Sequence, residues 1–446
     1  MKRVRSALLS SLVIVTIICP LARGQDAKAP GQLWEDFIHY IRIARLDLAA
    51  ASGRALLDQQ PAPEKFLQII EDSPYADDYD QTLIRAQRLE DEVAAVAEQV
   101  SAAIEEARLD LARNPDRIRG NIESLAEGLR ARMLAEQRLI RAGEYAAPAM
   151  LEVLISHRSE DEALRPLVIE TLVKMGRPIV QPLAEAMSEM PPVAKQDIAR
   201  VLARIGYPLA LPYLKTVAEQ PEIDEGSREV VNQAFAMIAD QAGVPEDVTA
   251  AELWLLLGED YYARRSSLIL DPDADYNLMW RFEGTGPLSA LRIPTAVFPD
   301  AMAMRATRRA MQLNPDMSGA LSLWIAANFR RENNLPDGED DPSYGSDMRS
   351  PQFYATIAGP RHLNPALGRG LAGDDAALAL DAVRALDATA GDESLLSSQT
   401  ENQPLLAAMN ETDRRVRFEA AMAVARAMPE DEFTGSERVV PVLAEA

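Results

Sequence analysis

The sequence predicts an all-α fold: a solenoid of stacked helix pairs that follows an N-terminal helical hairpin. Three observations predict it. The 446 residues are 48% hydrophobic but only 5% aromatic, and the apolar residues are chiefly the aliphatic ones that fill helix interfaces. Apolar residues recur at helical spacing along most of the chain. A phrase containing Gly and Pro returns about every thirty residues, and such a period is typical of solenoids.

The repeated phrase is clearest at 172–187, "LVKMGRPIVQPLAEAM", and at 202–217, "LARIGYPLALPYLKTV". A related phrase, "RAGEYAAPAMLEVL", precedes them, so that Gly143, Gly176 and Gly206 stand 33 and 30 residues apart. Glycine commonly ends one helix and proline begins the next. Each unit is therefore predicted to be a helix pair, with second helices at 163–175, 193–205 and 227–239. One such pair cannot bury its apolar side, but stacked pairs can.

A late phrase carries a family resemblance. "PLLAAMNETDRRVRFEAAMAVARAM" (404–428) has an Asp turn at Asp413, then Val416 and Arg417, then an Ala-rich helix. It resembles the HEAT repeat, particularly its short bacterial form, and 365–388 is a looser copy. The resemblance implies HEAT-like arrays at 140–244 and 365–446, and a structural role for the Asp and Arg in joining neighbouring repeats.

The middle of the chain follows another pattern. Trp254, Leu257, Gly258 and Tyr261 match the opening of a tetratricopeptide repeat, so 245–331 resembles a tetratricopeptide-like helical module. We expect its residues 281–300, rich in Gly and Pro, to form an irregular insertion. Residues 332–364, rich in Pro, Gly, Asp and Asn, are expected to form a long acidic loop that is either functional or disordered.

Residues 1–24 have the features of a signal peptide. Basic residues precede the apolar run Ala7–Cys19, and small residues stand before Gln25. We expect cleavage there and export to the periplasm or cell envelope, with no stable membrane span afterwards; an uncleaved anchor in the inner membrane is the alternative, and lipidation of Cys19 is less favoured. Since Cys19 is the only cysteine, the remaining chain can form neither disulfides nor thiolate metal sites.

Two apolar stripes follow in the N-terminal region, 25–139. One runs from Leu89 to Leu111 and the other from Ile118 to Met133, with Asn114-Pro115 between them. They predict a helical hairpin whose two arms pack on each other; a coiled-coil dimer is the alternative, but only about three heptads carry the pattern.

Charge and motifs exclude several functions. The formal net charge is −23, so nucleic acid is not an expected partner.

"DPDADYN" (271–277) has calcium-loop spacing, but Tyr276 and Phe282 replace the required Gly and Glu, so an acidic turn at the start of a helix is the better interpretation. "GRGLAG" (368–373) follows no strand and more plausibly ends a helix than binds a dinucleotide. The three histidines are far apart, and we expect no metal, no cofactor and no catalytic residue.

The leading hypothesis is a non-catalytic scaffold that binds a protein or peptide on the concave face of the solenoid. On helix 193–205 the residues predicted to face outward are Lys195, Gln196, Arg200 and Arg204, a positive strip suited to carboxylates. Ordinary surface residues that pair along the helix are the simpler interpretation of these four.

The alternatives are an enzyme with a site between the middle module and loop 332–364, or a purely structural envelope protein. The sequence fixes no oligomeric state. The last phrase, "SERVVPVLAEA", looks like the first helix of a repeat without its second. We therefore expect the C-terminus to pack on a partner, or the chain to be a shortened form of a longer one.

Overall fold

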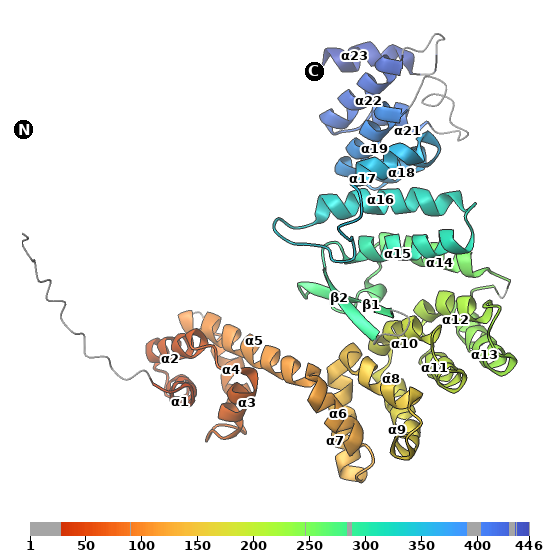
Figure 1. The fold of residues 1–446 in the computed structure, drawn as a ribbon. Helices are drawn as coiled ribbons and strands as arrows, with labels where there is room; N and C mark the ends of the chain where they lie inside the picture. The colour runs from red at the N-terminus through yellow and green to blue at the C-terminus, as the bar shows by residue number, and fades with distance from the viewer. Residues whose placement is uncertain are drawn as a thin grey trace, which may run out of the picture. The chain divides into compact units, whose positions relative to one another are not determined.

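The protein is largely helical, and its helices pack against their neighbours in sequence order, which confirms the predicted solenoid-like all-α fold (Figure 1). The computed structural model describes residues 28–89, 91–245, 247–282, 288–389, 403–427, 433 and 435–445. The predicted signal peptide, 1–24, lies outside these residues. Within them no helix combines the length and the apolar character needed to cross a membrane. The chain divides into two compact units, 1–111 and 112–446.

The first unit is a small helical cluster around Trp34. It contains α1 (Pro30–Arg42), α2 (Leu46–Asp58), α3 (Pro63–Glu71), α4 (Tyr79–Gln87) and the greater part of α5 (Glu92–Arg113). Trp34 is fully buried and makes edge contacts with Phe66 and Tyr79. α1 and α2 pack on each other and are separated at Ala44, which adopts a positive φ of 56°.

The two apolar stripes were predicted to pack on each other as the arms of a hairpin, and this prediction is wrong. The first stripe lies on α5, where Val93, Val96, Val100 and Ile104 join the core of the first unit. The second stripe is split between α6 (Pro115–Ser124) and α7 (Leu129–Ala142), which pack on each other. Gly128, with a φ of 145°, separates them. This break changes the face that α7 buries, and Leu129 is 75% exposed.

The first array contains three stacked helix pairs, each with a short 3₁₀ turn before its first helix. The turns and first helices are η1 (Gly143–Ala146) with α8 (Ala147–Ile155), η2 (Arg177–Ile179) with α10 (Val180–Met187), and η3 (Pro208–Ala210) with α12 (Leu211–Ala218). The second helices are α9 (Ser159–Met175), α11 (Pro192–Ile205) and α13 (Glu225–Ala242). First helices contact first helices and second helices contact second helices along the stack.

Glycine ends the helix before each of these turns. Gly143, Gly176 and Gly206 have φ values of 59°, 67° and 70°, a region that side chains with a Cβ disfavour. A proline follows in the first turn of the next helix. That position accepts proline because a backbone N–H there would have no partner within the helix. The repeated phrase in the sequence therefore encodes one recurring turn.

The middle module consists of α14 (Ala250–Tyr262), η4 (Ser266–Leu268), β1 (Tyr276–Phe282), β2 (Leu288–Pro294), α15 (Phe298–Leu313) and α16 (Ser318–Asn334). α14 packs on α15 and α16. Gly258 permits this, because a Cβ there would lie 3.0 Å from Thr307 Cγ2. The expected irregular insertion at 281–300 is wrong: β1 and β2 form an antiparallel pair, with Tyr276 opposite Pro294, and α15 begins at Phe298. The two strands contact α10 and α8, so the sheet covers first helices of the array.

The expected acidic loop is shorter than predicted. α16 continues to Asn334, and α17 (Pro351–Ala358) and the start of α18 (Pro360–Ala372) occupy the later part, leaving 335–350 without helix. The "GRGLAG" phrase lies at the end of α18, as expected. A Cβ on Gly370 would lie 2.9 Å from the Ala379 backbone nitrogen, so this glycine allows α18 to approach α19 (Ala376–Thr389).

A second stack follows at the C-terminal end. α18 and α19 form one pair, and α21 (Pro404–Ala408) with α22 (Arg414–Ala427) form the next. α18 contacts α21, and α19 contacts α22, which is the same like-with-like order as in the first array. η5 (Ser436–Arg438) then leads into α23 (Val439–Ala444), which packs on α22. Val440 on α23 is 74% exposed.

Candidate functional site

The predicted positive strip on α11 does not present four free polar side chains. Lys195 is buried, with 9% of its surface exposed, so its predicted outward orientation is wrong. Gln196 donates to the Ser227 hydroxyl on α13. Arg200 donates to Asp197 at 3.1 Å, and Arg204 binds both carboxylate oxygens of Glu170 on α9, at 2.7 and 2.9 Å.

These contacts join neighbouring second helices. The Arg204 guanidinium holds the pKa of Glu170 below its usual value, and Arg165 on α9 donates to Asp197 on α11 at 2.6 Å. The packing that brings a second helix alongside its neighbour also supplies each of these arginines with a carboxylate. The charge of the strip is thus largely compensated within the array.

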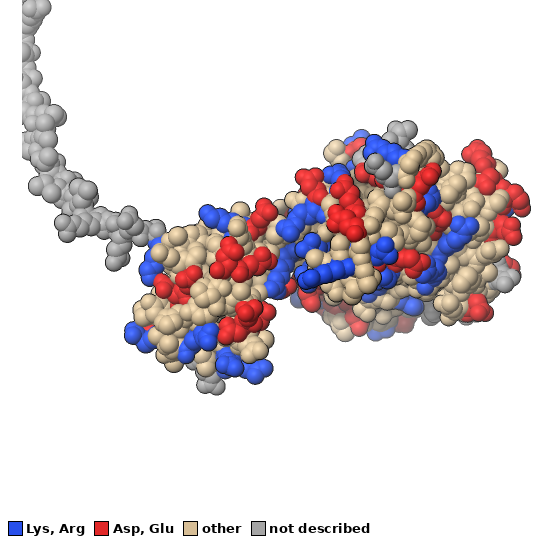
Figure 2. All heavy atoms as spheres, turned by 90° about the horizontal axis from the view of Figure 1, so that it is seen from below, with Lys and Arg blue, Asp and Glu red and all other residues tan. Residues whose placement is uncertain are grey.

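A different group of arginines lies on α15, which packs against the first array from the side of its first helices. Arg305, Arg308 and Arg309 are three and four residues apart and so share one side of the helix. The opposite side, with Ala303, Ala306 and Ala310, is buried against the module. The three arginines therefore project together, although the chain as a whole is strongly acidic. The face seen in Figure 2 carries charges of both signs.

Two of the three arginines are fixed by Glu185 of α10, which is 7% exposed. Arg305 and Arg309 both form ion pairs with its carboxylate, the latter at 2.5 Å. Arg305 also donates to the backbone carbonyl of Trp280 on β1 at 2.6 Å. Arg309 lies over the rings of Tyr213 and Trp254, 5.2 and 4.7 Å from their centroids. Burial raises the pKa of Tyr213, and the Glu185 carboxylate raises it further, so its hydroxyl stays protonated.

Arg308 is the exposed member of the group. Within the described residues it makes no hydrogen bond or ion pair, in contrast to Arg305 and Arg309. Its charge is available to a ligand, while its two neighbours are held in place beside it.

Two adjoining cavities open beside these arginines. The basic cavity, of about 480 Å³, lies between α15, the two strands and residues 342–348. Arg281, Arg305, Arg308 and Arg309 line it, with Glu185 and Asp347 as its carboxylates. The aromatic cavity, of about 310 Å³, lies between the ends of α10, α12 and α15; its walls include Tyr213, Val217, Trp254, Phe282 and Leu313. Glu185, Arg309 and Gln312 line both, so we call the two together the double cavity.

The double cavity combines two binding chemistries. Its basic part offers guanidinium groups, which match the geometry of carboxylates. In its aromatic part the indole of Trp254 is already paired, because Trp254 Nε1 donates to Thr216 Oγ1 at 2.8 Å. An apolar group can therefore pack against this wall without leaving the indole N–H unpaired.

The basic cavity lies between the middle module and residues 342–348 of the expected loop 332–364, where the enzyme alternative would have its site. His362 does not line it; its imidazole is partly buried, and burial lowers its pKa. The arginines of α15 were not singled out from the sequence. The available signal was "RATRRA" (305–310), three arginines at helical spacing in an acidic chain.

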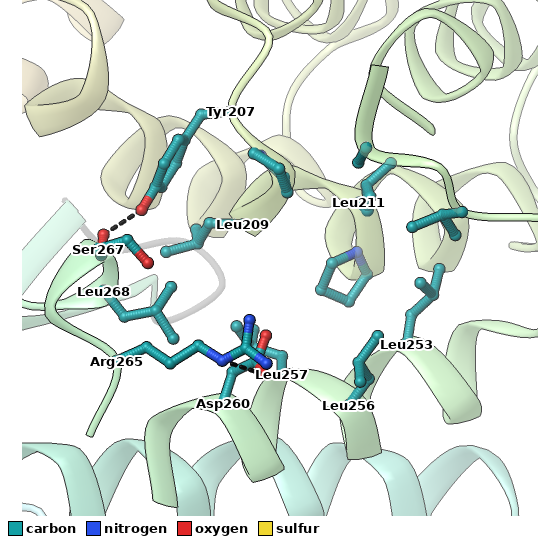
Figure 3. A pocket seen from close by; sticks show the side chains of 14 residues that line it. Tyr207, Leu209, Leu211, Leu253, Leu256, Leu257, Asp260, Arg265, Ser267 and Leu268 are labelled. Atoms are coloured by element: carbon teal, nitrogen blue, oxygen red, sulfur yellow. Dashed lines mark hydrogen bonds and ion pairs between the residues drawn. The ribbon is translucent and has the colours of Figure 1, made fainter. Parts of the chain in front are cut away.

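A third cavity, of about 420 Å³, lies between η3, α12, the end of α13, α14 and η4 (Figure 3). Its lining is largely apolar and includes six leucines, among them Leu209, Leu253 and Leu257. Asp260 and Arg265 pair with each other at 2.9 Å, and the Tyr207 hydroxyl donates to the Ser267 carbonyl. Its polar groups are thus satisfied internally, which gives a ligand little to recognise.

Residues 271–275, which have the spacing of a calcium-binding loop, form a turn. The turn precedes strand β1 and not the expected helix. Asn277 at the start of β1 is 5% exposed and donates to the Asp271 carbonyl and to Thr295 Oγ1 at 2.8 and 2.9 Å. Its side chain therefore ties the turn to β2. Across the described residues no three His, Cys, Asp or Glu side chains are grouped so that they could hold a metal ion.

Comparison with known proteins identifies no relative. No family model, no curated protein and no solved structure matches the chain.

Proposed function

We propose that the protein is an exported, non-catalytic scaffold of the cell envelope that binds a protein or peptide partner in the double cavity. The observation that carries this is the exposed Arg308, which has no partner among the described residues, beside Arg305 and Arg309, which Glu185 holds in place. A site with a free charge on a fixed support is preorganised for an anionic group. The second-helix face is less suitable, because its charges are engaged between helices.

We further propose that the helix pairs are HEAT-like. Asp413 accepts from the backbone nitrogens of Arg415 and Val416 at the start of α22, and Arg417 donates to the carbonyls of Glu411 and Thr412 and to the Glu445 carboxylate on the next element.

The same arrangement recurs in the first array. Asp224 caps α13 through the Ser227 nitrogen, and Arg228 donates to the carbonyls of Ala218, Gln220 and Ile223. The middle module is tetratricopeptide-like in this proposal, since α14 with Gly258 packs closely on α15 and α16.

The geometry supports binding better than acid–base catalysis. The carboxylates of the basic cavity are Glu185, which two arginines engage, and Asp347. A pair of carboxyl groups with separated pKa values, the usual acid–base arrangement, would require different surroundings for the two. A purely structural role gives no reason for an exposed, unpaired arginine next to two fixed ones.

The test is site-specific photo-crosslinking of the full chain in its own cells. A photoreactive residue at Gln312, which is exposed and lines both cavities, is expected to capture a discrete partner. The matched control is the same residue at Arg200, exposed on the second-helix face. Capture at position 200 but not at 312, or at neither, would refute the double cavity as the binding site.

Export is tested separately by the intact mass of the protein recovered from the envelope fraction. We expect a chain that begins at Gln25. A chain that retains residues 1–24 would contradict cleavage and favour the uncleaved anchor.

A further inference from the structure

We infer that the double cavity recognises an acidic–apolar peptide segment, with a carboxylate in the basic cavity and an aliphatic or aromatic side chain in the aromatic cavity. This inference rests on the proposed function and specifies its ligand. It follows from three features of the site: the charge that remains in the basic cavity, the walls of the aromatic cavity, and the residues common to both.

The charge balance of the basic cavity favours a carboxylate. Glu185 already binds Arg305 and Arg309, and Arg308, which also lines the cavity, is exposed without a partner among the described residues. The uncompensated positive charge therefore lies on the outer side of the group, at Arg308. A guanidinium with no other partner can take a carboxylate through two parallel hydrogen bonds. A nucleic acid fits poorly, because the chain carries a net charge of −23 that repels a phosphate backbone.

The aromatic cavity favours one apolar side chain. Tyr213 and Trp254 meet edge to face, with ring centroids 4.5 Å apart, and form a rigid wall. Arg309 covers both rings, so its hydrocarbon stem and guanidinium plane close one side of the space. The volume of about 310 Å³ lies at the lower end of the range of ligand pockets and has room for a leucine, isoleucine or phenylalanine side chain.

The shared lining requires that both groups belong to one short segment. Arg309 and Gln312 border the two cavities and lie about one helical turn apart on α15. A carboxylate beside Arg308 in the basic cavity and an apolar side chain against Arg309 in the aromatic cavity must therefore come from neighbouring residues of the ligand. Gln312, exposed between them, can donate to and accept from the backbone of that segment.

The test uses a peptide array and the purified full-length chain. The array carries every arrangement of one or two Glu with one Leu or Phe in a seven-residue Gly/Ser frame, together with copies that have Gln for Glu or Ser for the apolar residue. The best binder is then measured by fluorescence anisotropy. We expect each replacement to weaken binding at least tenfold, and added salt to weaken the Glu peptide more than its Gln copy.

Two protein variants assign the groups to the cavities. Arg308→Gln is expected to weaken the Glu peptide about tenfold and to leave the Gln copy unchanged. Leu313→Gln, at a position that is 45% exposed, is expected to reduce the advantage of the apolar residue over Ser. Both positions are exposed, so thermal unfolding should match that of the unaltered protein. Arg200→Gln, which removes the same charge on α11, is the control and should bind all peptides normally.

The inference is overturned if no array member binds, if Gln copies bind as tightly as Glu peptides, or if Arg308→Gln has no effect. Inorganic phosphate is added as a competitor. Equal displacement by phosphate and by a free Glu peptide would show a general anion site and would also overturn it. Crosslinking at Gln312 tests the proposed function independently: capture there with failure of all peptides rejects this ligand class alone.

Discussion

At the scale of single residues, Glu144 shows how burial changes an ordinary side chain. It lies in η1, directly after Gly143, and its carboxylate accepts the indole N–H of Trp280 on β1 at 2.6 Å. Burial raises the pKa of Glu144 to about 7, against the smaller opposing effects of the Trp280 hydrogen bond and the Arg113 charge. The residue thus joins the sheet to the first repeat, and does so at an energetic cost when it is ionised.

This pKa predicts a pH-dependent stability. Between its ordinary pKa near 4.5 and the folded value of about 7, the folded state holds a proton that the unfolded state has released. The free energy of unfolding therefore falls as pH rises through this window and levels off above it. Glu144→Gln removes the titration, so its stability relative to the unaltered protein should improve by roughly 3 kcal/mol from pH 4 to pH 8.

The measurement is urea unfolding at several pH values. Glu152→Gln on α8 makes the same change at an exposed position and serves as the control. A difference between Glu144→Gln and the unaltered protein that is constant with pH would show that Glu144 is not protonated in the folded state.

Replacing glycine by alanine should change the stability of the protein in opposite directions at two helical positions, Gly53 and Gly120. Gly53 on α2 lies against α1 and α5, and an added Cβ would clash with Val96 Cγ1 and lie 2.9 Å from Phe37 Cε2. Gly120 on α6 has no atom within 4 Å of the same position. Gly53→Ala should destabilise the protein by about 1–3 kcal/mol through overpacking. Gly120→Ala should stabilise it by roughly 0.5–1 kcal/mol, because alanine favours the helix. Thermal unfolding of the two variants, with shifts of opposite sign, checks this.

At the scale of elements, the second helices of the first array are joined by ion pairs of different burial. Arg165 and Asp197 have side chains that are 21% and 11% exposed, whereas Arg204 and Glu170 are 44% and 53% exposed. Water screens the second pair, and exposed pairs contribute at most about 1 kcal/mol. Removing Asp197 leaves Arg165 without this carboxylate in a partly buried place, whereas removing Arg165 leaves Asp197 with Arg200 as its remaining partner.

We therefore predict unequal coupling in two double-mutant cycles. The Arg165→Ala/Asp197→Ala cycle should give a coupling energy of roughly 1–2 kcal/mol, and the Glu170→Ala/Arg204→Ala cycle less than about 0.5 kcal/mol. Both are measured by urea unfolding at low and high salt, and the second coupling should almost vanish at 1 M salt. Equal coupling energies would mean that burial does not distinguish the two pairs.

The sequence predicted the elements of the arrays because a local rule repeats there. Gly143, Gly176 and Gly206 each need a positive φ, and a residue type that serves one backbone conformation is visible without knowledge of the fold. The β1–β2 pair was missed because the many Gly and Pro residues between 281 and 300 were interpreted as irregular chain. The strands are also short and packed on α10 and α8, and such burial weakens the polar–apolar alternation that marks an exposed strand.

The candidate site was harder to predict than the fold. Arg204 and Arg308 are both arginines on amphipathic helices and cannot be distinguished in the sequence. Only packing shows that Arg204 meets Glu170 from the neighbouring helix, while Arg308 lies beside a cavity formed by five separate segments: α10, β1, β2, α15 and residues 342–348. Helical periodicity identifies the side of a helix that is exposed, but the carboxylates that face it come from elements 30 or more residues away.

At the scale of the whole molecule, the apolar core divides into two clusters. One lies in the first unit, around Trp34, Phe37 and Val96. The other is continuous from Ile118 on α6 to Val442 on α23 and runs through both arrays and the middle module. Stacked repeats share one core with their neighbours, so that loss of one pair weakens the next. The two clusters, as far as the chain is described, have no residue in common.

This division predicts that damage to one cluster is confined to its unit. Gly53→Ala should raise amide hydrogen exchange through residues 28–111 and leave 112–445 unchanged. Leu172→Ala, at a fully buried position in the first array, removes about 2–5 kcal/mol of packing. It should raise exchange across both arrays and the middle module, because they share one core, and leave the first unit unchanged. Exchange read by mass spectrometry under native conditions resolves the units. If Gly53→Ala raises exchange along the entire chain, the two clusters unfold as one; if Leu172→Ala affects only residues 140–244, the stacked pairs lack the continuity that a solenoid requires.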